Sequence, residues 1–94
     1  MDRRCYFLKV KGLVQGVLFR DSAKRRAQAL GLKGYVKNCD DGSVEIIISN
    51  GEQSQTMNEF IVWAKKGPLF ARIDDIEVKE IPCEEEFQDF SVRS

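Results

Sequence analysis

The chain has 94 residues, 43% of them hydrophobic and 32% charged, which is room for one globular domain (residues 1–94) but not for two. Its fifteen basic and fifteen acidic residues give a formal net charge of zero, which argues against a nucleic-acid partner held by bulk positive charge. Histidine is absent, which excludes Ser-His-Asp and Cys-His nucleophilic sites as well as metal sites built on histidine.

The first half of the chain predicts a strand, a helix and a hairpin. Residues 5–11 are rich in β-branched and aromatic side chains and end in alternating lysines, a pattern typical of a strand. Apolar residues within 21–30 recur at helical spacing. A strand opening at 35–36 and another over 44–48 then flank the turn residues 40–42, which predicts a hairpin.

The second half predicts another helix and up to two more strands. Residues 52–66 place their apolar side chains on one helical face, and Gly67-Pro68 ends that helix. A strand follows over 73–81, although Asp74-Asp75 interrupts the alternation of apolar and polar residues. Phe90 and Val92 alternate with polar neighbours and predict a short edge strand near the end of the sequence.

The resulting order is β-α-β-β-α-β with an optional fifth strand. This predicts an α+β fold of the ferredoxin-like βαββαβ type, a sandwich with two helices on one face of a mostly antiparallel four- to five-stranded sheet. The same fold carries many unrelated functions, so the function must be argued from a site.

Cysteine usage and apolar runs bear on where the protein acts. The sequence has three cysteines, Cys5, Cys39 and Cys83, and no CxxC motif. An odd number without such a motif predicts neither a disulfide framework nor a zinc cluster, so we expect reduced thiols in the cytoplasm. The longest apolar run, Phe60–Ala64, is too short to cross a membrane. Lysines interrupt the N-terminal apolar stretch, which is therefore not expected to be a signal peptide.

Charge is uneven along the neutral chain. Residues 1–47 carry a net charge of +5, and residues 48–94 carry −5. An anion would be drawn to a site built by the first half, unless folding mixes the two halves in space.

Residues 12–20, GLVQGVLFR, leave the first predicted strand and enter the first predicted helix. Gly12 and Gly16 bracket a tight loop in which consecutive backbone N–H groups can converge beside the unpaired donors of a helix start. Such a concave row of amides is an anion site, and the guanidinium of Arg20 could bind a phosphate in a bidentate manner.

Each of these features also has a simpler explanation. Glycines four residues apart are common, and an arginine at a helix start is often only solvated. Val17 and Phe19 are explained as core residues beneath the loop, and Asn38 as part of the neighbouring turn. The residues alone leave both interpretations open.

Two longer motifs together resemble the acylphosphatase family. GLVQGVLFR matches the pattern G-x-V-Q-G-V-x-F-R at every defined position, and GYVKNCDDGSVE (34–45) matches the family's second signature from Gly34 through Val44. Trp63, Gly67-Pro68 and Ala71 are similar to the family's exit from its second helix. One departure is visible, since Asn50 stands where the family usually has glycine, and Gly51 follows it.

The resemblance implies hydrolysis of acyl phosphates to a carboxylate and inorganic phosphate, without a cofactor or metal. It makes Arg20 the phosphate-binding residue and Asn38 the residue that positions the attacking water, while Asp21 would repel phosphate if it faced the site. The backbone amides implied to cradle the phosphoryl oxygens are those of Gln15, Gly16, Val17, Leu18, Phe19 and Arg20.

The expected partners are accordingly a small-molecule acyl phosphate and inorganic phosphate. Nucleic acid and membrane are not expected as partners, and no conspicuous apolar run demands a second subunit, so we expect a monomer. A non-catalytic anion- or RNA-binding ferredoxin-like module is the alternative, since Lys33-Gly34-Tyr35 matches the start of an RNA-recognition strand whose later aromatic residues this sequence lacks. A further alternative is the accessory domain of hydrogenase-maturation carbamoyltransferases, which carries the same loop within a much larger chain.

Overall fold

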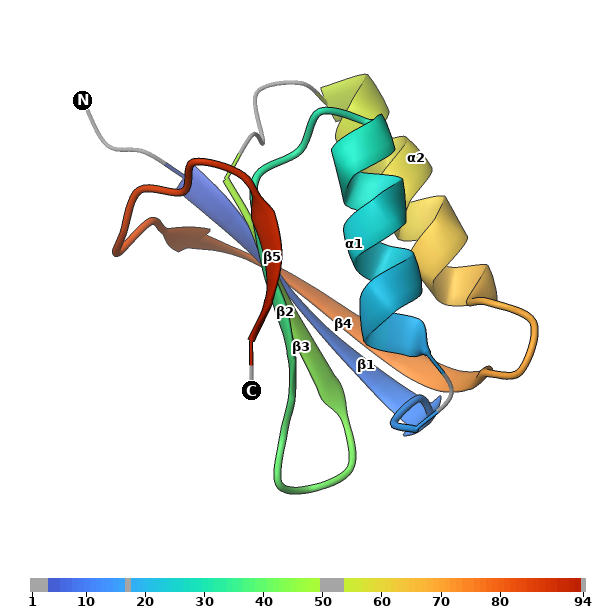
Figure 1. Cartoon of the computed structure of the whole chain (residues 1–94). Coiled ribbons are helices and arrows are strands. Elements are labelled where there is room, and N and C mark those ends of the chain that lie inside the picture. The colour runs from blue at the N-terminus through green and yellow to red at the C-terminus, as the bar shows by residue number, and fades with distance from the viewer. Residues whose placement is uncertain (1–3, 17, 50–53, 94) are drawn as a thin grey trace.

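Five strands form one sheet, and two helices cover one of its faces (Figure 1). The computed structural model describes residues 4–16, 18–49 and 54–93. The sheet order is β4-β1-β3-β2-β5, and every pair of neighbours is antiparallel except the parallel pair β2 and β5. In chain order the elements are β1 (Arg4–Leu13), α1 (Phe19–Ala29), β2 (Gly34–Asn38), β3 (Val44–Ile48), α2 (Ser54–Lys66), β4 (Arg72–Pro82) and β5 (Phe90–Arg93).

The predicted order of elements and the ferredoxin-like arrangement are confirmed, and the optional strand at 90–92 is β5 at the edge of the sheet. The hairpin predicted around residues 40–42 joins β2 to β3. Helix α1 begins at Phe19, two residues before the predicted start. Residues 50–53, which include the departure at Asn50, lie outside the described residues. Among the described residues, neither helix has the length and apolar content needed to cross a bilayer.

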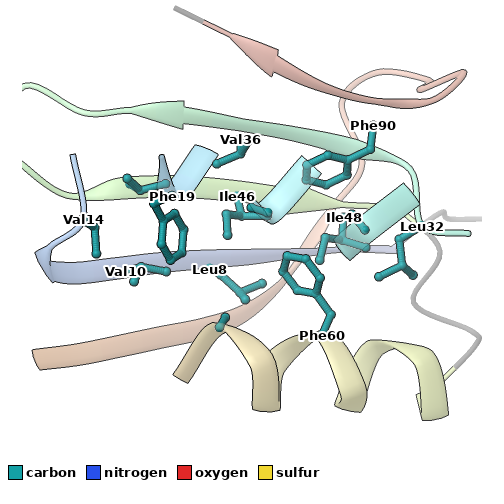
Figure 2. Close-up of a cluster of buried hydrophobic side chains, with 14 of the residues drawn as sticks. Leu8, Val10, Val14, Phe19, Leu32, Val36, Ile46, Ile48, Phe60 and Phe90 are labelled. Atoms are coloured by element: carbon teal, nitrogen blue, oxygen red, sulfur yellow. The ribbon is translucent and has the colours of Figure 1, made fainter. Parts of the chain in front are cut away.

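The hydrophobic core lies between the sheet and the helices (Figure 2). Alternate residues of the central strands point into it, because successive side chains of a strand face opposite sides of the sheet. Helix α1 contributes Phe19, and α2 contributes Phe60, whose rings lie 5.5 and 5.6 Å from that of Trp63. The side chains labelled in Figure 2 are all buried: Leu8, Val10, Val14, Phe19, Leu32, Val36, Ile46, Ile48, Phe60 and Phe90.

A bulge between β1 and β4 explains the interrupted alternation in the sequence. Lys11 pairs with Asp75, but Gly12 pairs with Ile73, so Asp74 is an extra residue in β4. Gly12 has a φ of 136°, and a Cβ atom there would collide with the main chain of β4. Only glycine fits this position, which lies one residue before the end of β1.

The expectation that all cysteines are reduced thiols is wrong, because Cys5 and Cys83 form a disulfide across 78 residues of sequence. The antiparallel register pairs Cys5 with Ile81 and so brings the two cysteine Cα atoms to 5.0 Å. Cys39 is a free thiol. Disulfides persist in oxidising compartments and in the intracellular proteins of hyperthermophiles, so the cytoplasmic location loses the support that reduced thiols gave it.

Removing the bridge is expected to destabilise the fold. The disulfide closes a loop of 78 residues in the unfolded chain, so Cys83→Ser should lower the free energy of unfolding by about 2–4 kcal/mol. Guanidinium unfolding of the variant and of the oxidised wild type measures the difference. Cys39→Ser, which leaves the bridge intact, is the control and should change stability by less than about 1 kcal/mol. Equal stability of oxidised and reduced wild type would contradict this assignment.

Candidate active site

Helix α1 begins without a side-chain cap. Its N-cap residue is Leu18, which makes no capping hydrogen bond and has a left-handed backbone with φ 62° and ψ 20°. Gly16 is also left-handed, with φ 74°. A left-handed leucine is strained by about 1–2 kcal/mol, and such strain concentrates at functional sites. The first-turn amides of an uncapped helix have no intrahelical acceptor, so they can donate to an anion.

The side chains of the loop divide between solvent and core. Leu18 is 76% exposed, whereas the ring of Phe19 is buried, as the core interpretation of that residue expected. The loop can therefore offer its backbone while Phe19 anchors it to the core beneath. Val17, which was expected both in the core and in the phosphate loop, lies outside the described residues.

Arg20 lies in the first turn of α1 and is half-buried. Its Nη1 donates to the main-chain oxygen of Arg93 at 3.3 Å, and no carboxylate of the described residues forms an ion pair with it. Asp21 instead pairs with Arg25 at 3.0 Å, one turn along the helix. The acidic neighbour is thus engaged elsewhere, and the charge of Arg20 remains available to an anion.

Gln15 joins the β1–α1 loop to the β2–β3 turn. Its Nε2 donates to the main-chain oxygen of Cys39 at 2.8 Å and to that of Ser43 at 2.9 Å. Both carbonyls belong to the segment that follows Asn38, and Cys39 N in turn donates to Ser43 O at 2.8 Å. One amide group therefore holds the loop against the end of β2.

The β2–β3 turn is itself held by a carboxylate. Asp41 accepts hydrogen bonds from Ser43 Oγ at 2.5 Å and from Ser43 N at 3.0 Å, and it pairs with Lys9 of β1 at 3.0 Å. The hydrogen bonds from Ser43, reinforced by Lys9, hold the pKa of Asp41 well below its usual range. Gln15 therefore binds a turn whose shape is already fixed.

Asn38 is the last residue of β2. Its side chain lies on the same face of the sheet as that of Val36, which points into the core (Figure 2). Its Oδ1 is buried and has no hydrogen-bond partner among the described residues. Because an amide can both accept and donate, Asn38 can bind and orient a water molecule.

Arg20 and Asn38 are linked indirectly, through Arg93 and the register of β2 and β5. Lys37, the neighbour of Asn38, is paired with Arg93, whose carbonyl accepts from Arg20. These contacts place Gln15, Arg20 and Asn38 near the same end of the sheet. Sequence reasoning missed the contacts of Gln15 and of Arg93. Only the Asp-Gly-Ser turn had a recognisable signal, because aspartate often binds the backbone two residues on.

In the described part of the chain no cluster of three or more His, Cys, Asp or Glu side chains could hold a metal ion.

Residues 6–92 match the family model described as Acylphosphatase. An acylphosphatase of Caldivirga maquilingensis is 52% identical over 85 residues, which span 89% of this chain and 87% of that protein. The crystal structure of an acylphosphatase from Bacillus subtilis is similar with a TM-score of 0.87 at 36% identity, covering 97% of this chain and 99% of the other. The structure of HypF from T. kodakarensis is similar over 97% of this chain but only 12% of its own, with a TM-score of 0.83 at 40% identity.

Gln15→Ala tests the junction between the loop and the turn. The change removes two hydrogen bonds and leaves two carbonyls without that donor, so the free energy of unfolding should fall by about 1–3 kcal/mol. Gln28→Ala is the matched control, because it removes a single longer bond to Phe90 O, at 3.3 Å, away from the loop. Chemical denaturation compares the two variants. If the Gln15→Ala protein is no less stable than Gln28→Ala, the hydrogen bonds of Gln15 to the β2–β3 turn do not contribute to the free energy of unfolding.

Proposed function

The chain belongs to the acylphosphatase family and is an enzyme that hydrolyses acyl phosphates, and we propose which of its residues bind the phosphoryl group and which position the attacking water. The backbone amides of residues 15–20 and the guanidinium of Arg20 bind the phosphoryl group. Asn38 orients the water that attacks phosphorus. No side chain forms a covalent intermediate, and the reaction uses neither a cofactor nor a metal.

The observation that supports this assignment is that a helix start without a side-chain cap and a buried amide oxygen without a partner among the described residues lie near the same end of the sheet. The uncapped start of α1 supplies amide donors next to Arg20, and the buried Oδ1 of Asn38 has no partner among the described residues. Gln15 binds the main chain beside Asn38 and so holds the two segments together. Donors for a dianion and an acceptor for water are what hydrolysis of a phosphate anhydride requires.

The chemistry needs few catalytic groups. The leaving group is a carboxylate whose conjugate acid has a pKa of about 4–5, so it departs at neutral pH without a general acid. Water attacks in line, the new P–O bond forms, and the bond to the acyl oxygen breaks. One proton of the attacking water passes to a phosphate oxygen, which leaves a carboxylate and dihydrogen phosphate. The absence of histidine is no obstacle to this reaction.

Electrostatic positioning supplies the acceleration. In a loose phosphoryl-transfer transition state the charge is spread over the equatorial oxygens, and preorganised amides with one guanidinium stabilise it there. The planar fork of Arg20 matches two oxygens at once, which a lysine ammonium cannot do. Asn38 holds water in line with the bond that breaks, and this lowers the entropy cost of attack.

The remaining attributes follow from the same assignment. The substrate is a small-molecule acyl phosphate, and the protein works as a single domain over 1–94, as a monomer and without nucleic acid. We place it in the cytoplasm, where acyl phosphates arise as metabolic intermediates. The Cys5–Cys83 disulfide does not by itself exclude the cytoplasm, because intracellular proteins of hyperthermophiles also carry disulfides.

Substitutions at Arg20 and Asn38 separate binding from turnover. Arg20→Ala should abolish competitive inhibition by phosphate together with hydrolysis of benzoyl phosphate, and Arg20→Lys should restore little, because the fork is lost. Asn38→Ala should lower kcat by about 10²–10³-fold while phosphate still competes. The measurement is phosphate release from benzoyl phosphate in the presence of a chelator.

Arg26→Ala is the matched control, since Arg26 lies in the last turn of the same helix and forms no ion pair among the described residues. It should retain close to wild-type kcat and phosphate affinity. Full activity in Asn38→Ala would reject the role of that residue. Loss of wild-type activity with the chelator would reject the metal-free mechanism.

A further inference from the structure

Arg93, the last residue of β5, contacts the proposed phosphate-binding arginine through its main chain. Its carbonyl oxygen accepts the hydrogen bond from Arg20 Nη1 at 3.3 Å. Strand β5 has four residues and is an edge strand, whose one neighbour in the sheet among the described strands is β2. The end of such a strand frays easily, so a carbonyl there holds a partner firmly only if something else fixes the residue.

The side chain of Arg93 is fixed on the other side of the sheet from the helices. Its Nη1 and Nη2 each donate to Glu85 at 3.0 Å, a bidentate pair. Its guanidinium carbon lies 4.2 Å from the ring centroid of Tyr35 and 5.7 Å from that of Phe87. The rings of Tyr35 and Phe87 contact each other, with centroids 5.9 Å apart. We call Glu85, Tyr35 and Phe87 the Arg93 clamp.

The clamp joins the β4–β5 connection to the body of the sheet. Tyr35 belongs to β2 and faces away from the core, because its neighbour Val36 points into it. Glu85 and Phe87 lie in the connection, which Figure 1 shows leaving β4 and returning to β5 on the side away from the helices. The guanidinium of Arg93 is thus held between a strand and a loop.

The protonation states of the clamp favour this geometry at neutral pH. Burial, together with the hydrogen bond that Tyr35 donates to Glu45 at 2.8 Å, raises the pKa of Tyr35 to about 12, so its ring stays neutral. The hydrogen bonds from Arg93 lower the pKa of Glu85, which therefore stays ionised. A neutral aromatic face and a carboxylate both attract a guanidinium.

We infer that Arg93 is a positioning residue for Arg20: its side chain, held by the clamp, fixes the main-chain oxygen that orients the Arg20 guanidinium toward phosphate. The inference rests on the phosphate-binding role proposed for Arg20. One Nη1 donor directed to a fixed carbonyl sets the plane of the guanidinium, and its other N–H groups are then aimed before the substrate arrives. Binding is stronger when the donor need not be ordered during the reaction.

Glu85→Gln tests this inference, because it replaces the charged bidentate acceptor of Arg93 without touching α1 or the loop. The inhibition constant for phosphate should rise about 3–10-fold, kcat/KM for benzoyl phosphate should fall by a similar factor, and kcat should change less. Glu80→Gln is the matched control, because Glu80 pairs with Arg4 at 2.9 Å and both side chains are 48% exposed, close to the 42% and 48% of Arg93 and Glu85. Glu80→Gln should leave the phosphate constant unchanged, and both variants should melt at similar temperatures.

Arg93→Lys adds a second readout. It keeps the positive charge opposite Glu85 but loses the two-pronged guanidinium and its planar stacking on Tyr35. Its inhibition constant for phosphate should therefore lie between those of the wild type and Arg93→Ala. A merely structural role would instead move the melting temperature and leave the phosphate constant alone.

Unchanged phosphate constants in Glu85→Gln and Arg93→Ala would overturn the inference, as would an equal rise in Glu80→Gln. Both outcomes would leave the role of Arg20 standing, provided that Arg20→Ala loses phosphate binding. Full phosphate affinity in Arg20→Ala would contradict that role itself and the inference with it, so the two failures are distinguishable.

Discussion

The left-handed backbone at Leu18 is the constraint around which the site is arranged. It starts α1 directly after a loop and without a side-chain cap, so that the first-turn amides keep their donors for a ligand. Before the loop, a side chain at Gly12 would collide with the main chain of β4, and after it the ring of Phe19 is buried in the core.

In the binding mode we propose, a protein with no net charge can hold a dianion because the attraction is local. Backbone dipoles and one guanidinium act at hydrogen-bond distance, where they need no surrounding field of lysines. The nearest acidic side chain along the chain, Asp21, is turned along the helix to Arg25. The excess of positive charge in the first half of the sequence is consistent with this site, since both the loop and Arg20 belong to that half. A carboxylate leaving group then removes the need for an acid, and with it the need for histidine.

Much of the fold could be predicted from local patterns, whereas contacts between distant segments could not. Hydrophobic periodicity gave the order of elements, and the interruption at Asp74-Asp75 corresponds to a bulge. The Cys5–Cys83 bridge was missed because it depends on the register of β1 and β4, which cysteine spacing does not contain. In the site, the motifs pointed to Arg20 and Asn38, but Gln15 reaches Cys39 and Ser43 only once the hairpin is folded. The ion pair between Glu85 and Arg93 likewise had no signal, because Glu85 belongs to the acidic run 84–86 and such a run usually indicates a solvated loop.

The most direct test of the amide cradle is a titration of the ¹⁵N-labelled protein with inorganic phosphate, followed by ¹H–¹⁵N correlation spectra. The backbone amides of residues 15–20 and the Nε–H of Arg20 should shift together along one saturable curve, because they bind the same ion. The amides of the exposed basic residues Arg25 and Arg26 should not follow that curve. Unmoved loop amides, with shifts confined to such surface positions, would contradict the claim that the main chain holds the phosphoryl group.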